Sequence, residues 1–239
     1  MSVDAVVWRD AAVIDPARFE AFREGALRGW LARGLDPQLR ERLRRDPDGL
    51  LATGVVLKDD AASTVVALAE HACVLKRFRF PDAWRALRRA PRTSRALLAF
   101  RAALRLEALG FGVAAPLGVV DARTCGLGTA SWLLTIGLPG RDAGALLADP
   151  TLDDAARARL VEALVEVVRR LQRCRVVHGD LKASNFLVDE RSVRLLDLHA
   201  VGRVRRADHV GLRRDRRRFL RNFEAWPVLR ARARALLGG

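Results

Sequence analysis

The sequence predicts an α+β fold in two parts: a small antiparallel sheet that packs against one helix, followed by a mainly helical part. Two observations predict it. Between residues 49 and 136, short segments rich in Val and Leu alternate with polar turns, and one helical block interrupts them. From residue 137 to 239, most apolar residues recur at helical spacing. A chain of 239 residues has the length of a single catalytic domain with two lobes.

Residues 1–48 are predicted to form a helical N-terminal extension, because apolar residues recur at helical spacing from residue 16 and a second short helix follows before residue 48. The first residues mix acidic and basic side chains with apolar ones and lack the continuous apolar region of a signal peptide. No run of about 18 uncharged apolar residues follows anywhere. We therefore expect a cytoplasmic protein that at most lies on a membrane.

The segment 49–136 is predicted to form the sheet-containing lobe. LLATGVVLK, STVVALAE and HACVLKRFRF read as three antiparallel strands. A helical block at 81–109 should break at Pro91, with Thr93 or Ser94 as a cap and Gly110 as its end. GVVDAR and SWLLTIGL supply two further strands.

The segment 137–239 is predicted to be the helical lobe. A long amphipathic helix should begin after Asp153 or Asp154 and end near Cys174. FLVD and VRLLDL then form a hairpin, and a basic helical tail covers residues 212–237.

A set of polar residues at fixed spacing lies inside this helical lobe. His178-Gly179-Asp180-Leu181-Lys182-Ala183-Ser184-Asn185 precedes a strand, and Leu196-Asp197-Leu198 follows the hairpin. Phosphoryl transfer needs a carboxylate that takes the acceptor proton, oxygen ligands for Mg²⁺ and a cation at the transferred group. Asp180 fits the first role, Asn185 and Asp197 the second, and Lys182 the third. The set matches the His-x-Asp-x4-Asn loop and metal-binding Asp of the protein-kinase-like fold, in which His178 would brace the loop.

The same fold requires a lysine on the third strand of the first lobe to hold the nucleotide's α- and β-phosphates. Cys73-Val-Leu-Lys76-Arg-Phe is such a strand, so Lys76 is the predicted phosphate anchor. Taken alone, it would be an ordinary lysine of an edge strand.

Over most of residues 50–224 the sequence resembles the lipopolysaccharide kinase family, the bacterial Kdo and heptose kinases of the lipopolysaccharide inner core. The similar segments are STVV with VLKRF, SRALLAFRAALRLEALGFGVAAPLG, LLTIGLPG, HGDLKASNFLV with LLDLHAV, and LRRDRRRFLRNF. The resemblance implies ATP and Mg²⁺ as cofactors. It makes Asp180 the catalytic base, and Asn185 and Asp197 the metal ligands. It also implies a hinge at Thr135, Ile136, Gly137 and Leu138 whose backbone pairs with adenine.

Three positions depart from that pattern. The turn from Lys58 to Thr64 contains no glycine, and its Asp59 and Asp60 would repel phosphates unless they face solvent. Ala99 stands where a helix glutamate should pair with Lys76, and Glu107 lies two turns later. His199 occupies the position that is glycine in protein kinases. A catalytically weak or inactive nucleotide-binding relative is therefore one alternative.

The formal charge of +15 favours polyanionic partners. We expect an anionic glycolipid acceptor, the lipopolysaccharide core, or another small molecule or a protein as the alternative, and no nucleic acid, since no helix-turn-helix or zinc pattern accompanies the charge. Peripheral contact with an anionic membrane is a further expectation, and solvated arginines are its alternative. The basic residues concerned are Arg40, Arg42, Arg44, Arg45, Arg203, Arg205, Arg206, Arg213, Arg214, Arg216, Arg217 and Arg218.

Overall fold

The structure is a computed structural model that describes residues 14–79, 93–124, 127–190 and 192–238. The chain divides into two compact units. Unit 1 comprises residues 1–105 and 114–138, and unit 2 comprises residues 106–113 and 139–239.

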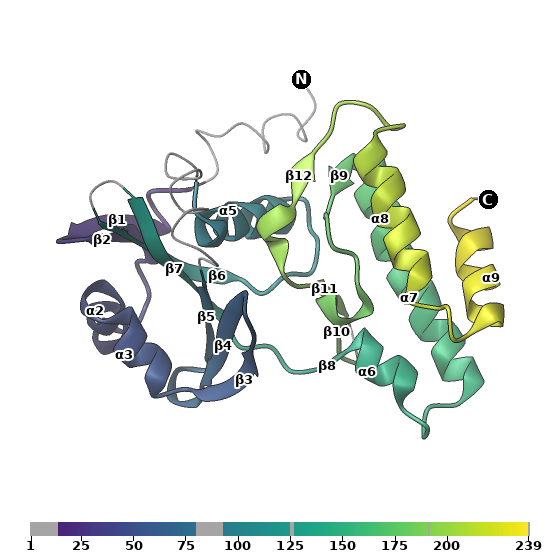
Figure 1. The fold of residues 1–239 in the computed structure, drawn as a ribbon, viewed down its shortest axis with the longest axis horizontal. Helices are drawn as coiled ribbons and strands as arrows, with labels where there is room; N and C mark the ends of the chain where they lie inside the picture. The colour runs from purple at the N-terminus through teal and green to yellow at the C-terminus, as the bar shows by residue number, and fades with distance from the viewer. Residues whose placement is uncertain (1–13, 80–92, 125–126, 191, 239) are drawn as a thin grey trace. The chain divides into compact units, whose positions relative to one another are not determined.

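Within the described residues, unit 1 contains one antiparallel sheet with the strand order β1-β2-β6-β7-β5-β4-β3 (Figure 1). Its strands are β1 (Phe19–Glu24), β2 (Leu27–Ala32), β3 (Val55–Asp59), β4 (Ser63–Leu68), β5 (Cys73–Phe78), β6 (Pro116–Thr124) and β7 (Leu127–Ile136). The three strands predicted at 50–80 and the two at 118–138 are confirmed as β3–β5 and β6–β7. They pair as consecutive hairpins, apart from the β5–β7 pair at the centre of the sheet.

The helix predicted from residue 16 is wrong, because these residues form the β1–β2 hairpin. Gly25, at φ +53°, makes its turn, and β2 pairs with β6. A Cβ at Gly29 would lie 1.9 Å from the carbonyl oxygen of Val119, so a glycine is needed where β2 approaches β6. The pairing of β2 with β6 joins segments about 90 residues apart, and the local spacing of apolar residues cannot predict it.

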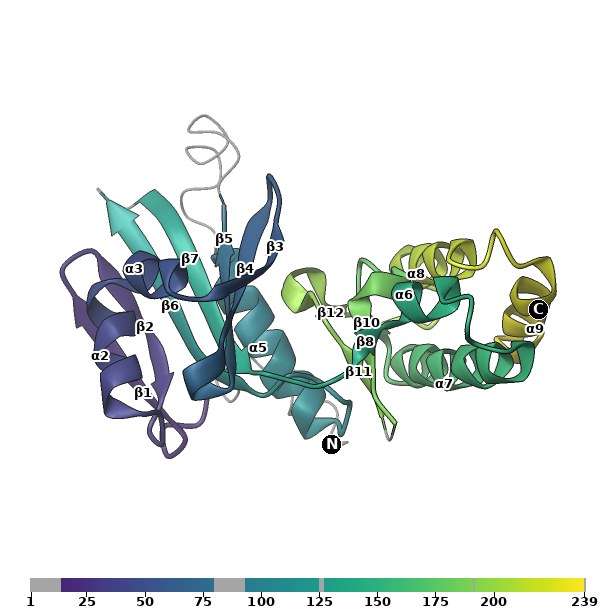
Figure 2. The same ribbon diagram turned by 90° about the horizontal axis from the view of Figure 1, so that it is seen from below.

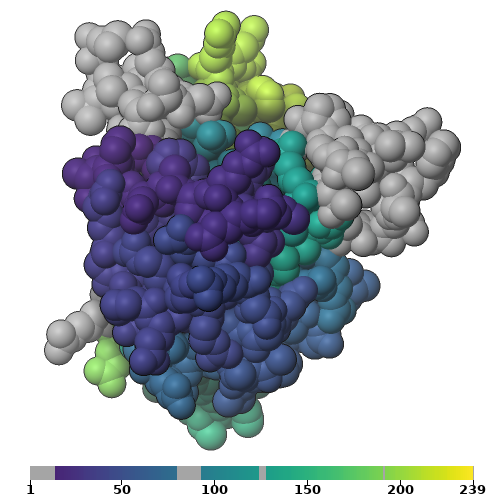
Figure 3. Space-filling model, turned by 90° about the vertical axis from the view of Figure 1, so that its left-hand side faces the viewer, coloured from purple at the N-terminus to yellow at the C-terminus, as the bar shows by residue number. Residues whose placement is uncertain are grey.

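One face of the sheet is covered by α2 (Pro37–Arg45) and α3 (Pro47–Ala52), the first of which was predicted. Asp36 and Asp46 cap their N-termini through the amides of Leu39 and Gly49. Figure 3 looks onto this side of unit 1, where the purple and blue residues of the hairpin and the two helices lie together. The core beneath them includes Leu31, Leu39, Leu43, Leu50, Leu75, Val120, Trp132 and Leu134.

The helix α5 (Arg95–Ala108) packs on the sheet through Phe100, whose ring centroid lies 5.0 Å from that of Phe19. Ser94 caps it by accepting the amide hydrogen of Leu97, and Gly110 ends it at φ +72°. Both were predicted. The first half of the predicted block at 81–109, to residue 92, lies outside the described residues.

Unit 2 contains, in chain order, β8 (Arg141–Asp142), α6 (Ala143–Ala148), α7 (Asp154–Arg173), β9 (Val176–Val177), η3 (Ala183–Asn185), β10 (Phe186–Val188), β11 (Val193–Leu195), η4 (Leu198–Ala200), β12 (Gly202–Arg203), α8 (Val210–Arg221) and α9 (Pro227–Leu236) (Figure 2). The predicted long helix is α7, capped by Asp153, and the predicted hairpin is β10–β11. The basic tail is helical but divided, because the chain turns at 222–226 before Pro227. None of the helices in the described ranges is long and apolar enough to cross a membrane.

Candidate active site

The segment between β9 and η3 is held by the buried ring of His178. Nε2 of His178 lies 3.1 Å from the carbonyl oxygen of Leu196, and Nδ1 accepts the amide hydrogen of Asp180 at 3.3 Å. Burial lowers the pKa of His178 to about 4, so the ring is neutral at pH 7 and can accept that bond. The predicted bracing role agrees with these contacts, which tie this loop to the end of β11.

The carboxylate of Asp180 is surrounded by donors. Lys182 Nζ lies 2.9 Å from Oδ2, Asn185 Nδ2 lies 3.2 Å from the same oxygen, and Arg218 donates to Oδ1. Burial would raise the pKa of Asp180, but Lys182 and then Arg218 outweigh it and hold the pKa below its usual value. Asp180 is therefore ionised at neutral pH and able to accept a proton. The structure thus brings together three sequence-predicted residues, Asp180, Lys182 and Asn185.

Asn185 and Asp197 supply the oxygen ligands that Mg²⁺ prefers. The side-chain amide of Asn185 donates to the carbonyl oxygen of Asp180 at 2.8 Å, which leaves its Oδ1 as an acceptor. The amide of Leu196 donates to the carbonyl oxygen of Asn185, so Asp197 follows directly after a residue bonded to Asn185. Asp197 has a left-handed backbone, at φ 57°, and its Oδ1 lies 2.7 Å from His199 Nδ1.

These donors fit a hard divalent cation. The described residues hold no group of three or more His, Cys, Asp and Glu arranged for a metal. Mg²⁺ in phosphoryl-transfer sites is commonly held by one or two protein oxygen ligands together with substrate phosphates and water, and Asn185 and Asp197 could be those ligands.

The helix α8 and its C-cap residue contribute three side chains, about one turn apart, that hold the loop in place. Buried Asp215 accepts the amide hydrogens of His178 at 2.6 Å and Gly179 at 3.0 Å. Asn222 donates to the carbonyl oxygen of Leu181 and accepts the amide hydrogen of Ala183, both at 3.0 Å. Arg218 lies between them, on Asp180.

Sequence reasoning missed this function of α8. One signal was present: Leu212, Asp215 and Phe219 share a helical spacing that places an aspartate on the apolar face of an arginine-rich helix. A buried carboxylate on such a face needs backbone donors. Phe219, also on this face, packs edge-on against Phe186 of β10 with centroids 6.0 Å apart.

The remaining predicted site residues belong to unit 1 or to its end. Lys76 lies in β5, with its ammonium 4.8 Å from the centroid of the Phe78 ring. Thr135 and Ile136 end β7, and Gly137 and Leu138 close the unit. The amide of Ile136 donates to Ala115 and that of Gly137 to Ala72, so neither is available to a base.

The glycine-free turn between β3 and β4 is closed by its own acidic residues. Asp60 Oδ1 accepts the amide hydrogens of Ala62 and Ser63, both at 2.8 Å, and Lys58 Nζ lies 2.9 Å from Asp60 Oδ2. Lys58 and these two amides hold the pKa of Asp60 well below its usual range. Asp59 pairs with Arg79 and accepts the hydroxyl of Thr64. The expected repulsion is thus reduced by a cation on each carboxylate.

Ala99 is buried in α5, at 2% exposure, so no carboxylate occupies the position where the sequence comparison expected one. Glu107 lies two turns later, in the part of the helix that groups with unit 2.

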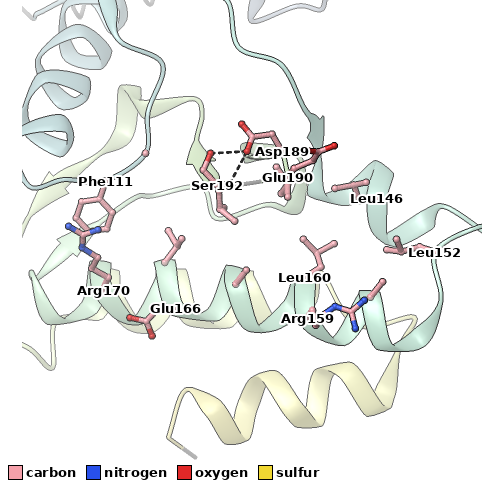
Figure 4. Close-up of a pocket in the computed structure, with 16 residues that line it drawn as sticks. Phe111, Leu146, Leu152, Arg159, Leu160, Glu166, Arg170, Asp189, Glu190 and Ser192 are labelled. Atoms are coloured by element: carbon pink, nitrogen blue, oxygen red, sulfur yellow. Dashed lines mark hydrogen bonds between the residues drawn. The ribbon is translucent and has the colours of Figure 1, made fainter.

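A separate pocket of about 570 Å³ lies in unit 2 between α7, α6 and the β10–β11 hairpin (Figure 4). Apolar side chains such as Leu146, Leu152 and Leu160 line it, with Arg159 and Glu166 at its side on α7. Asp180, Lys182, Asn185 and Asp197 are absent from its lining, so it is not the site described above.

The fold and the polar loop together define a protein-kinase-like phosphotransferase: an antiparallel sheet on which α5 packs, a mainly helical unit, and an Asp-x-Lys-x2-Asn loop followed by a second aspartate. A family model described as Lipopolysaccharide kinase (Kdo/WaaP) family matches residues 76–237, about two thirds of the chain. The chain belongs to the lipopolysaccharide kinase (Kdo/WaaP) family, and it is a kinase.

Two solved structures are similar to this chain. WaaP in complex with acyl carrier protein is 19% identical, with a TM-score of 0.47 over 84% of this chain and 97% of that chain. The PknI kinase domain of M. tuberculosis is 16% identical, with a TM-score of 0.43 over 69% and 67%. No curated protein matches the chain.

Proposed function

We propose that this kinase transfers the γ-phosphoryl group of ATP to a hydroxyl of Kdo or heptose in the lipopolysaccharide inner core. The observation that carries the proposal is the ionised Asp180, which accepts hydrogen bonds from Lys182 and Asn185 of the same loop. A carboxylate so placed orients an acceptor hydroxyl and accepts its proton. Family membership supports a lipopolysaccharide acceptor.

In the proposed reaction the acceptor oxygen forms a bond to the γ-phosphorus while the bond to the β–γ bridging oxygen breaks. The hydroxyl proton goes to Asp180, and ADP leaves with the bridging oxygen. Lys182 neutralises charge on the transferred group. Mg²⁺ bound by Asn185 and Asp197 would neutralise phosphate charge and hold the phosphates in position.

Unit 1 is proposed to bind the nucleotide. Lys76 would hold the α- and β-phosphates, and the segment Thr135–Leu138 would bind adenine. The amides of Ile136 and Gly137 are engaged within the unit, so adenine would pair with other backbone groups of this segment.

The acceptor would be reached at an anionic membrane surface. Exposed arginines before and along α8, Arg205, Arg214 and Arg217, support such peripheral contact. The inner face of the inner membrane is thus the proposed location.

The test is transfer of labelled γ-phosphate from Mg-ATP to purified lipopolysaccharide core, with the product located by mass spectrometry. Asp180→Asn should reduce kcat about 10²–10⁴-fold, since a general base contributes that much. Its affinity for Mg-ATP, measured by thermal shift, should persist. Core that gains no phosphate with the wild-type protein would contradict the proposal.

Ala99 favours a second candidate, a nucleotide-binding protein with little catalysis, because the Lys–Glu pair is normally required in protein kinases. Mg-ATP binding without transfer to core, to other sugars or to proteins would support it. Alanine replacement of Asp180 would then change no measured turnover.

A further inference from the structure

Arg218 contacts a side chain of the catalytic loop, whereas its two neighbours on the same face of α8 contact the loop backbone. Asp215 binds the amides of His178 and Gly179, and Asn222 binds backbone groups of Leu181 and Ala183. The guanidinium of Arg218 donates to Oδ1 of Asp180. The other two already hold the loop in place, so this contact serves the carboxylate itself.

Both oxygens of Asp180 accept hydrogen bonds in this structure. Oδ2 accepts from two side chains, Lys182 and Asn185, whereas Oδ1 accepts from Arg218. Each carboxylate oxygen can accept two hydrogen bonds, so Oδ1 can still accept one from an acceptor hydroxyl. Under the proposed function Lys182 and Asn185 remain with the phosphates and the metal, so Oδ1 is the oxygen for the acceptor and Arg218 is the cation beside it.

The charges around Asp180 favour an acidic acceptor. One carboxylate faces two cations, Lys182 and Arg218, which leaves a surplus of one positive charge. The Arg218 side chain is 39% exposed, so its guanidinium can be reached by a further anion. Carboxylates and phosphates are the anions that a guanidinium binds with two parallel hydrogen bonds.

We propose that Arg218 determines acceptor specificity by binding a carboxylate or phosphate carried next to the acceptor hydroxyl. The guanidinium has five N–H donors, so it can bind that anion beside Asp180 and place the hydroxyl at Oδ1. The inference rests on the proposed phosphotransfer at Asp180. It makes the acceptor a sugar that already carries an acidic group beside the hydroxyl.

The kinetic test compares three acceptors: core oligosaccharide, the same core with its carboxylates amidated, and the same core with its phosphates removed. Arg218→Gln should raise the acceptor KM about thirtyfold or more, the lower end for loss of one partner of a charge pair. The KM for ATP should stay that of the wild type. Arg218→Lys keeps the charge but not the planar fork, so its acceptor KM should lie between those of the wild type and Arg218→Gln. Arg221→Gln, an exposed arginine one turn further along α8, is the matched control.

The decisive readout is the preference for the anionic over the neutralised acceptor. The wild type and Arg221→Gln should show it, and Arg218→Gln should lose it. A variant that loses kcat but keeps the preference would show that Arg218 is only structural, and would overturn the proposal. Thermal unfolding of Arg218→Lys checks that the loop remains folded.

A binding measurement separates this inference from the proposed function. The Nε–Hε resonance of Arg218, assigned by its absence in Arg218→Lys, should move on addition of Kdo or of inorganic phosphate, but not of Kdo methyl ester. A response to Kdo alone identifies a carboxylate and a response to phosphate alone a phosphate. No response to either overturns the inference, even if core is phosphorylated. A response without transfer to any core contradicts the proposed function and leaves the anion site standing.

Discussion

At the scale of single residues, His178 illustrates how a titratable group can serve the site without touching substrate. Its ring is fully buried and neutral, and it joins the loop carrying Asp180 to the strand end that leads to Asp197. The histidine pKa of about 4 in the fold lies below the ordinary value of 6.5 because burial disfavours the charged ring. Between these two values the unfolded chain binds a proton that the folded protein does not.

The free energy of unfolding should therefore fall as pH falls from 6.5 to 4, through the contribution of His178. The full contribution is about 3 kcal/mol, at about 1.4 kcal/mol per pKa unit. In His178→Gln, whose amide can still donate to Leu196, this part of the pH dependence should be absent. Urea unfolding of both proteins at several pH values measures it. Parallel curves for the two proteins would contradict a neutral buried ring.

At the scale of secondary-structure elements, α8 holds the loop 178–185, and Asp215 is its most buried polar residue on that side. Two amide hydrogens reach the Asp215 carboxylate, and burial raises its pKa in spite of them. Asp215→Asn keeps the size of the side chain but presents an amide group to two N–H donors. We expect a loss of about 1–3 kcal/mol in the free energy of unfolding, the cost of an unsatisfied buried group.

The same variant should lower kcat, because Gly179 and Asp180 would no longer be fixed, while the KM for ATP changes little. Arg214→Gln, an exposed neighbour on α8, is the control for general effects of changing the helix. Unchanged stability in Asp215→Asn would mean that the loop is held by other contacts.

The turn between β3 and β4 is the second element to test. Asp60 occupies the amides of Ala62 and Ser63, and it pairs with Lys58. If this turn covers the nucleotide phosphates, Asp60→Ala removes a negative charge and frees these two amides for them. The KM for ATP should fall several-fold, since one added charge-assisted contact contributes about 1 kcal/mol.

Glu70→Ala, which removes an exposed carboxylate beyond the other end of β4, controls for the change in net charge. A KM for ATP that rises or stays constant in Asp60→Ala would show that the turn does not contact phosphates.

These elements show which features could be read from the sequence. The loop 178–185, Lys76 in β5, the cap at Asp153 and the β10–β11 hairpin are local patterns in which spacing or residue type carries the information. The β1–β2 hairpin depends on the pairing of β2 with β6, about 90 residues away. Asp215 binds the amide of His178, which is 37 residues away. Helical spacing of apolar residues in 16–34 therefore gave the wrong structure, because strand pairing at the edge of a sheet outweighed local preference.

At the scale of the whole molecule, the formal charge of +15 comes from arginines of two kinds: some are paired within the structure and others are exposed. Arg40, Arg44 and Arg45 form ion pairs with Glu20, Glu24 and Glu41, which reduces the basic character of α2. In unit 2, Arg213 and Arg216 donate to backbone carbonyls. Arg205, Arg214 and Arg217 are exposed, and an anionic lipid surface attracts their positive charge.

The triple variant Arg205→Gln, Arg214→Gln, Arg217→Gln should therefore bind anionic vesicles about 100-fold more weakly than the wild type, at about 1 kcal/mol for each arginine. Co-sedimentation with phosphatidylglycerol vesicles measures this, and wild-type binding should weaken as salt rises because the attraction is screened. Arg23→Gln, Arg42→Gln, Arg45→Gln removes the same charge from exposed positions of unit 1 and should bind nearly as the wild type does. Equal losses in both triple variants would mean that net charge, and not the surface around α8, governs membrane binding. Binding by neither the wild type nor any variant would exclude the membrane contact and leave the arginines as solvated charges.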